Sequence, residues 1–168
     1  MSRKVAVPAG AGTFAIQIPE TGTLGPGDYA VSVRLSPEAG SDLAMTDTVR
    51  VTVPDRAAPI GEAVIWRRGP STGPQYLRTA DPRFQRSERL RLEYATPSDG
   101  SATATARLLD RAGKPIQVPV AITSRADTVA GVRWIVADAT LAPLAAGDYA
   151  VELTFGGTTQ VTGFRIVP

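Results

Sequence analysis

The sequence of 168 residues contains no cysteine, no histidine and no asparagine. Disulfide bonds and thiolate nucleophiles are therefore excluded, together with the imidazole and thiolate ligands that most zinc sites use. Without histidine, the chain lacks the side chain that most often acts as a general base near neutral pH. N-linked glycosylation requires asparagine and is excluded as well. We therefore expect a non-enzymatic protein with no catalytic residues, no cofactor and no metal.

Excess charge of one sign and long apolar runs are also absent. Lys and Arg number 18 against 16 Asp and Glu, for a net charge of +2, which gives weak attraction to nucleic acid or to anionic lipid. No apolar run approaches the roughly 18 to 20 residues of a membrane span. We expect no nucleic-acid partner and no membrane span, and any secretion leader to lie outside this chain.

What the sequence does contain is alternation of apolar and polar residues with a period of two, which is typical of half-buried strands. The 14 prolines and 16 glycines separate these segments at short intervals. The pattern predicts an all-β fold, an immunoglobulin-like Greek-key β-sandwich. The expected strands cover residues 14–18, 29–35, 49–53, 63–66, 90–94, 104–109, 116–122, 132–137, 149–155 and 161–167.

The chain also contains an internal repeat. Residues 24–31 (LGPGDYAV) return 120 residues later as 144–151 (LAAGDYAV), and 49–54 correspond to 164–168, so that each copy ends on Val-Pro. Residues 14–16 match 134–136, and 4–8 resemble 115–119. In each copy, Leu-x-x-Gly-Asp-Tyr before an alternating strand resembles a tyrosine corner, with Tyr29 and Tyr149 in structural roles. The matching Phe14 and Trp134 are expected as core anchors.

The two copies are unequal in length. Residues 55–168 hold seven expected strands, enough for one complete immunoglobulin-like sandwich. Residues 1–54 hold only the last four strands of a second, with residues 4–8, which resemble 115–119, as the first of the four. Four strands cannot cover their own apolar face. The expected assembly face consists of Phe14, Ile16, Ile18, Val31, Val33, Val49 and Val51, with Tyr29 and Val53 beside them.

Two functions follow from an incomplete sandwich. In the first, other copies of the chain would supply the missing strands and so build a filament or stalk by strand complementation. Alternatively, the missing strands belong to an upstream domain of the same protein, and the chain is a C-terminal accessory interaction module.

Seven arginines lie between residues 67 and 91, against two acidic residues, Asp81 and Glu88. The long connection from 67 to 87 is a candidate contact loop, through which the chain would contact a neighbouring subunit or bind a glycan or polyanion. The opposing interpretation is a solvated charge ladder, with Arg89 and Arg91 on the outward side of a strand. The candidate loop residues are Arg67, Arg68, Tyr76, Arg78, Arg83, Phe84 and Arg86.

Residues 69–73 (GPSTG) match the Gly-x-Ser-x-Gly pattern of serine hydrolases. That elbow requires a strand-to-helix turn and a histidine partner. The chain has no histidine and no helical pattern follows, so we interpret the segment as a loop.

Residues 61–70, 79–92 and 106–115 together resemble the β-sandwich region that follows von Willebrand factor A-type domains in some bacterial proteins. The resemblance covers nearly the whole chain. It implies a non-enzymatic module of a secreted or cell-surface protein. The adhesion-type domain and its metal-site motif are absent here, so the resemblance does not extend to metal-dependent adhesion.

Overall fold

The computed structural model describes residues 2–8, 10, 14, 16, 18–19, 24–37, 44–53, 59–97, 103–127 and 132–168. The chain divides into two compact units. We name them the hairpin unit, Met1–Ser2 with Gln17–Ala57, and the sandwich unit, Arg3–Ile16 with Ala58–Pro168. The boundary expected between residues 54 and 55 lies outside the described residues.

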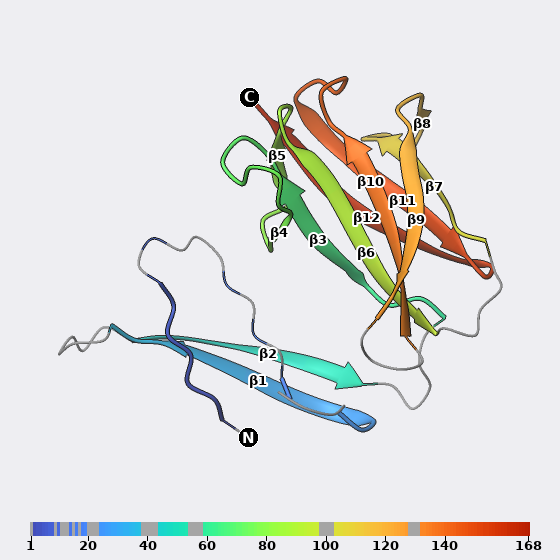
Figure 1. Cartoon of the computed structure of the whole chain (residues 1–168). Helices are drawn as coiled ribbons and strands as arrows, with labels where there is room; N and C mark the ends of the chain where they lie inside the picture. The colour runs from blue at the N-terminus through green and yellow to red at the C-terminus, as the bar shows by residue number, and fades with distance from the viewer. Residues whose placement is uncertain are drawn as a thin grey trace. The chain divides into compact units, whose positions relative to one another are not determined.

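The hairpin unit is built on two long antiparallel strands, β1 (Gly27–Leu35) and β2 (Met45–Val53) (Figure 1). Their register places Gly27 opposite Val53 and Leu35 opposite Met45. Of the strand expected over residues 14–18, residues 14, 16 and 18 are described and none of them lies in a strand. The described part of residues 1–54 therefore contains two strands, where four are expected from the sequence.

The sandwich unit is all-β, and none of its described residues is helical. One sheet has the order β4-β3-β6-β10-β9 and the other β5-β12-β11-β7-β8. All neighbouring strands are antiparallel except β5 and β12, which are parallel. The strands are β3 (Ala63–Arg68), β4 (Leu77–Arg78), β5 (Arg83–Gln85), β6 (Arg89–Pro97), β7 (Thr105–Asp110), β8 (Pro115–Ile116), β9 (Val120–Ala126), β10 (Val132–Thr140), β11 (Gly147–Phe155) and β12 (Thr158–Val167).

The predicted all-β sandwich is confirmed, although the described residues of this unit form ten strands rather than seven. The additional strands β4, β5 and β8 are only two or three residues long. Two of them, β4 and β5, subdivide the connection from residue 67 to residue 87. Parts of that connection therefore pair with the two sheets, through β4 on β3 and β5 on β12. Periodicity does not predict such short strands, because they contain too few alternating residues.

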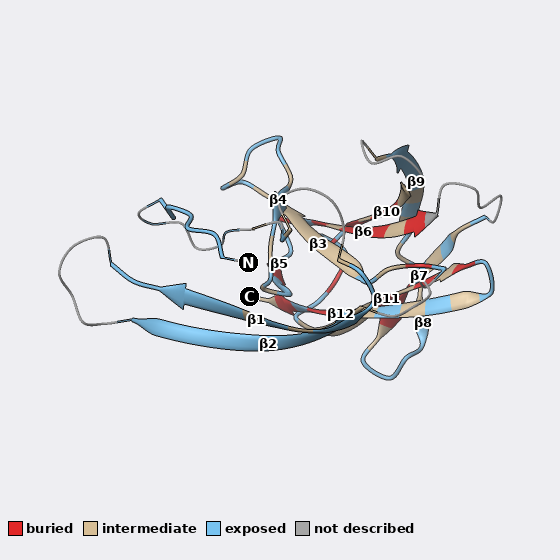
Figure 2. Ribbon diagram, turned by 90° about the horizontal axis from the view of Figure 1, so that it is seen from below, coloured by how far each residue is buried: buried red, intermediate tan, exposed pale blue. Residues whose placement is uncertain are grey.

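The core lies between the two sheets of the sandwich unit (Figure 2). Every second residue of a strand points inward, so alternation places one apolar row from each strand in the interior. The first sheet contributes Leu90, Leu92, Tyr94, Ile135, Ala137 and Ala139, and the second contributes Phe84, Leu108, Val151, Leu153, Phe155, Phe164 and Ile166. Leu144, at the repeated motif, is also buried.

Neither residue expected as a matched core anchor is fully buried. Ile135 takes the inward position on β10, so the preceding Trp134 points to the outer face of the sheet. There it is half-buried beneath the Arg125 guanidinium, and its indole N–H donates to Asp127. Phe14 is 44% exposed. The sequence match between the two aromatic residues therefore does not reflect a shared place in a core.

Truncation of Leu153 tests the core of the sandwich unit. Leu153 is fully buried on β11, so Leu153→Ala should lower the free energy of unfolding by about 2–5 kcal/mol. Both tryptophans, Trp66 and Trp134, lie in this unit, so their fluorescence during urea unfolding reports on it. The control is Val161→Ala on the neighbouring strand, where the side chain is 59% exposed and the expected loss is under about 0.5 kcal/mol. Equal losses in the two variants would contradict this assignment of the core.

Candidate functional site

The first candidate site is one side of the β1–β2 hairpin. Directly opposed residues of an antiparallel pair point to the same side. Tyr29 lies opposite Val51, and Val31 lies opposite Val49. Each intervening pair contains at least one polar residue, for example Ser32 with Thr48, whose hydroxyl oxygens lie 2.7 Å apart. We define the hairpin face as the apolar side, formed by Tyr29, Val31, Val33, Leu35, Met45, Val49, Val51 and Val53.

The hairpin face is open to solvent along most of its length (Figure 2). Met45 is 75% exposed, Val49 57% and Val51 41%. A two-stranded hairpin is marginally stable in water, because it has no second layer to bury its apolar side. Asp47, opposite Val33, interrupts the apolar row on β2.

The structure brings together four of the seven residues expected on an assembly face. Val31, Val33, Val49 and Val51 share the hairpin face. Phe14 and Ile18 are exposed and Ile16 is half-buried, but none of the three lies in a strand, so they are not part of the hairpin face.

Two further face residues, Leu35 and Met45, were missed by the sequence prediction. The alternation from Tyr29 to Leu35 carries the signal for Leu35. The charge at Asp47 breaks the alternation that would have identified Met45.

Both copies of the repeat form the same hydrogen bond between a tyrosine hydroxyl and the upstream backbone. The Tyr29 hydroxyl donates to the carbonyl oxygen of Gly25 at 2.7 Å, and the Tyr149 hydroxyl donates to that of Ala145 at 3.1 Å, each four residues upstream. The glycine two residues before each tyrosine has a positive φ, 144° at Gly27 and 155° at Gly147. Few other residues adopt this backbone conformation. The repeat is therefore a repeat of local structure as well as of sequence.

The hairpin in the sandwich unit that matches β1–β2 is β11–β12. Its register places Gly147 opposite Ile166 and Tyr149 opposite Phe164, as Gly27 lies opposite Val53 and Tyr29 opposite Val51. There, however, the apolar side is covered. Val151, Leu153 and Phe155, the counterparts of Val31, Val33 and Leu35, are at most 4% exposed.

Three elements cover β11–β12 in the sandwich unit. The sheet that contains β6 and β10 packs on its apolar side, β7 pairs with the free edge of β11, and β5 pairs with the free edge of β12. In the hairpin unit, β1 and β2 pair only with each other among the described residues. The hairpin face therefore matches a surface that is buried in the sandwich unit, but it is itself largely exposed.

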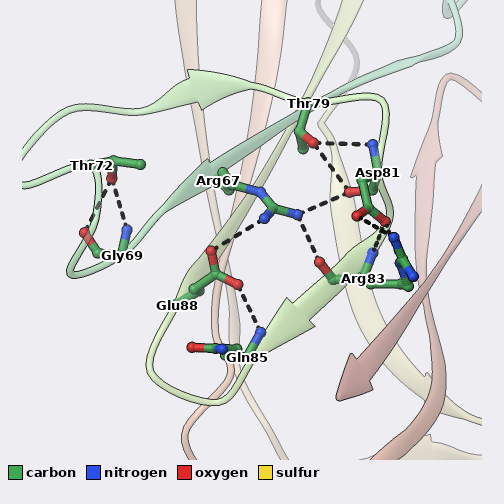
Figure 3. A network of polar contacts seen from close by, with 8 residues as sticks. All are labelled: Arg67, Gly69, Thr72, Thr79, Asp81, Arg83, Gln85 and Glu88. Carbon is green, nitrogen blue, oxygen red and sulfur yellow. Dashed lines mark hydrogen bonds and ion pairs between the residues drawn. The ribbon is translucent and has the colours of Figure 1, made fainter. Parts of the chain in front are cut away.

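The second candidate site is the arginine-rich connection, where Arg67 is the central residue (Figure 3). Its guanidinium donates to the carbonyl oxygens of Asp81 at 3.1 Å and Arg83 at 2.7 Å, and its Nη1 lies 3.6 Å from Glu88 Oε1. It also stacks over the Phe84 ring, 4.9 Å from its centroid. Phe84 is fully buried, so it is part of the core and cannot belong to a contact surface.

Glu88 completes this network from the other side. It is a buried carboxylate, 7% exposed, and its Oε2 accepts the backbone N–H of Gln85 at 2.7 Å. Gly69 packs so closely against it that a Cβ there would lie 2.8 Å from Glu88 Cγ. Thr72 closes a turn onto Gly69 through its backbone N–H and its hydroxyl. The GPSTG segment is thus a tight turn after β3 and not a strand-to-helix elbow.

The other arginines of the connection also have partners within the molecule. Arg83 forms a bidentate pair with Asp81, at 2.9 and 3.0 Å, and Arg86 donates to the Ala142 carbonyl oxygen at 2.6 Å. Arg68 stacks over Tyr76, and Arg78 stacks over Trp66.

Arg91 differs from the solvated ladder expected from the sequence. It pairs with Asp138 through two bonds of 2.9 and 3.0 Å and lies 3.9 Å from the centroid of the Tyr76 ring.

A surface pocket beside Arg67 is lined by Arg83, Asp81 and Glu88 as well, so both signs of charge meet there. An anion therefore finds little net attraction in this pocket.

The described residues contain no group of three or more acidic side chains placed to hold a metal ion. Within the same part of the chain, no helix is long and apolar enough to cross a membrane.

Replacement of Arg67 tests whether the network is structural. Arg67→Met leaves the Glu88 carboxylate buried without its cation, so the free energy of unfolding should fall by about 2–4 kcal/mol in urea denaturation. The matched variant Arg68→Met removes only a stacking contact and should cost under about 1 kcal/mol. If both variants were as stable as the parent, the network would have no structural role.

The ionisation of Asp81 tests the Arg83 pair. The hydrogen bonds from the Arg83 side chain and backbone lower the pKa of Asp81 from 3.8 to about 2. Because the folded-state pKa is depressed, the stabilisation is present above pH 4 and is lost as the pH falls from about 4 to about 2. In a carboxyl NMR titration, Asp81 should stay ionised at pH 3. In Arg83→Gln its midpoint should return toward 3.8, and an ordinary midpoint in the parent would contradict the pair.

Comparison with protein-family models, with curated proteins and with solved structures finds no match to this chain. Its function must therefore be inferred from the two sites, because a fold class by itself does not specify a function. Of the two, the arginine-rich connection has a partner within the molecule for each of its arginines, although Arg67 Nε itself has no hydrogen-bond partner among the described residues. The hairpin face, by contrast, leaves large apolar side chains exposed to solvent.

Proposed function

We propose that this chain is a non-enzymatic structural protein that acts through strand complementation at the β1–β2 hairpin. One observation carries the proposal: β1–β2 repeats the register and tyrosine corner of β11–β12, yet exposes the apolar side that β11–β12 buries. A surface whose close counterpart is buried is a surface suited to burial by a partner.

We further propose that the sandwich unit is an immunoglobulin-like module. Its two sheets contain the runs β3-β6-β10-β9 and β7-β11-β12, which agree with the orders ABED and CFG of that fold. In this assignment β11 and β12 are the strands F and G. By the repeat, β1 and β2 are then strands F and G of a second module whose other strands are absent from the described residues.

The energetics favour completion of the hairpin. Full burial of a large apolar side chain stabilises a protein by about 1.5–3 kcal/mol. Val33, Leu35, Met45, Val49 and Val51 are between 38% and 75% exposed. Covering these five would recover on the order of 5 kcal/mol, enough to offset much of the cost of association.

The proposed assembly is a homopolymer. When each copy completes the hairpin of the next copy, the contact is head-to-tail and propagates into a filament or stalk. The resemblance noted in the sequence favours a secreted or surface-associated setting for such a structure. If the strands instead come from an upstream domain, the same face closes within one polypeptide and the chain acts as an accessory module. Binding of a polyanion or glycan by the connection is not proposed, because its arginines have partners within the molecule.

Self-association tests this function directly. Light scattering coupled to size-exclusion chromatography should show an apparent mass that rises with protein concentration. Val49→Lys places a charge on the hairpin face and should abolish the rise, because a buried unpaired charge is strongly unfavourable. Thr48→Lys introduces the same charge one residue away on the polar side and should still assemble. A parent that stays monomeric at every concentration would contradict self-assembly.

A further inference from the structure

We infer that the edge of β1 that is unpaired among the described residues is the acceptor for the completing strand. We further infer that this strand pairs antiparallel in the register that β7 adopts on β11. The inference rests on the proposed function and specifies the chemistry of the partner. The partner is an extended segment similar to β7, with a large apolar residue opposite Val31 and a small one opposite Val33.

The assignment to the β1 edge, and not the β2 edge, follows from how β11 and β12 are paired in the sandwich unit. In the sandwich unit, β7 pairs with the edge of β11 over six residues, whereas β5 pairs with the edge of β12 over only three. The edge of β1 is nine residues long and contains no proline that would interrupt hydrogen bonding. Long, unprotected edges of this kind readily accept another strand.

The register follows from the residues that β7 presents to β11. Leu108 lies opposite Val151, and Ala106 lies opposite Leu153. Because β1 matches β11 residue by residue, the same strand on β1 would place Leu108 opposite Val31 and Ala106 opposite Val33. Its apolar residues would then extend the hairpin face instead of opposing it.

The polar side of β1 distinguishes the partner from a simple copy of β7. On β11, Glu152 pairs with Arg107 of β7 at 2.6 Å. On β1 the corresponding residue is Ser32, which offers no charge, and the next position on the polar side is Arg34, where β11 has Thr154. The preferred partner therefore carries an acidic residue opposite Arg34, at the place that Thr105 occupies in β7.

The absence of native cysteine allows a test by disulfide cross-linking. The probe is a synthetic peptide covering Thr103–Ala112. Ser32→Cys in the full chain should form a disulfide with a peptide that carries Arg107→Cys, because the inferred register puts the two side chains directly opposite each other. A peptide with Ala106→Cys should react at least about ten-fold less, since its thiol lies on the other side of the sheet.

A second chain variant reports on which edge is used. Thr48→Cys lies opposite Ser32 on β2, so a peptide on the β1 edge is two strand spacings away, about 10 Å. Its adduct with the Arg107→Cys peptide should stay at the level of the mismatched pair. Preferential reaction at Thr48→Cys would overturn the assignment to β1. Equal reaction of both peptides with Ser32→Cys would overturn the register.

A competition experiment tests the role of Arg34. The unlabelled peptide with Thr105→Glu should compete about two- to five-fold better than the parent peptide, and this advantage should disappear in Arg34→Gln. If the advantage persisted in Arg34→Gln, the glutamate of the peptide would not be paired with Arg34. The chain variants Ser32→Cys and Arg34→Gln both lie on the exposed polar side of the hairpin, so they should leave tryptophan-detected unfolding of the sandwich unit unchanged.

Failure of this inference is distinguishable from failure of the proposed function. A chain that stays monomeric in light scattering but captures the peptide at Ser32→Cys has the inferred acceptor edge without self-assembly. A chain that assembles but does not capture the peptide at this register uses another edge or only its apolar face, and the inference is then wrong. If neither result is obtained, both proposals are wrong.

Discussion

A β-strand with alternating residues makes one apolar side, and that side requires a second layer to cover it. In the sandwich unit the requirement is met, because two five-stranded sheets bury each other's apolar rows. The hairpin β1–β2 carries the same kind of row without such a layer among the described residues. This unmet requirement connects the exposed valines, the repeat and the proposed assembly.

In the arginine-rich connection, the arginines contact other groups of the sandwich unit. Arg67 reaches two backbone carbonyl oxygens and the buried Glu88 while its planar group stacks on Phe84. One guanidinium thus provides several donors in fixed directions and an apolar stacking plane, which lysine cannot do. The abundance of arginine here is explained by this internal cross-linking, and an external anion is not needed to account for it.

Sequence alone predicted the features that arise from local periodicity and self-comparison. Alternation located β1, β6 and β11, and the Gly-Asp-Tyr repeat marked the two tyrosines whose hydroxyls bond to the upstream backbone. It did not predict the inward position of Phe84, because its three-residue strand β5 is defined by parallel pairing with distant β12. The partners of Arg91 and Arg86 are likewise separated from them by 47 and 56 residues, beyond what spacing can reveal.

The two hairpins differ in size where a second layer would contact them. Val33 stands in place of Leu153, and Val51 stands in place of Phe164. Protein interiors are filled to a nearly constant density, so smaller residues on one layer require larger ones on the facing layer. A copy of the β6 and β10 sheet would leave voids on the hairpin face, each with a cost in stability. The layer that packs on the hairpin face must therefore carry bulkier inward residues against Val33 and Val51 than the β6 and β10 sheet carries.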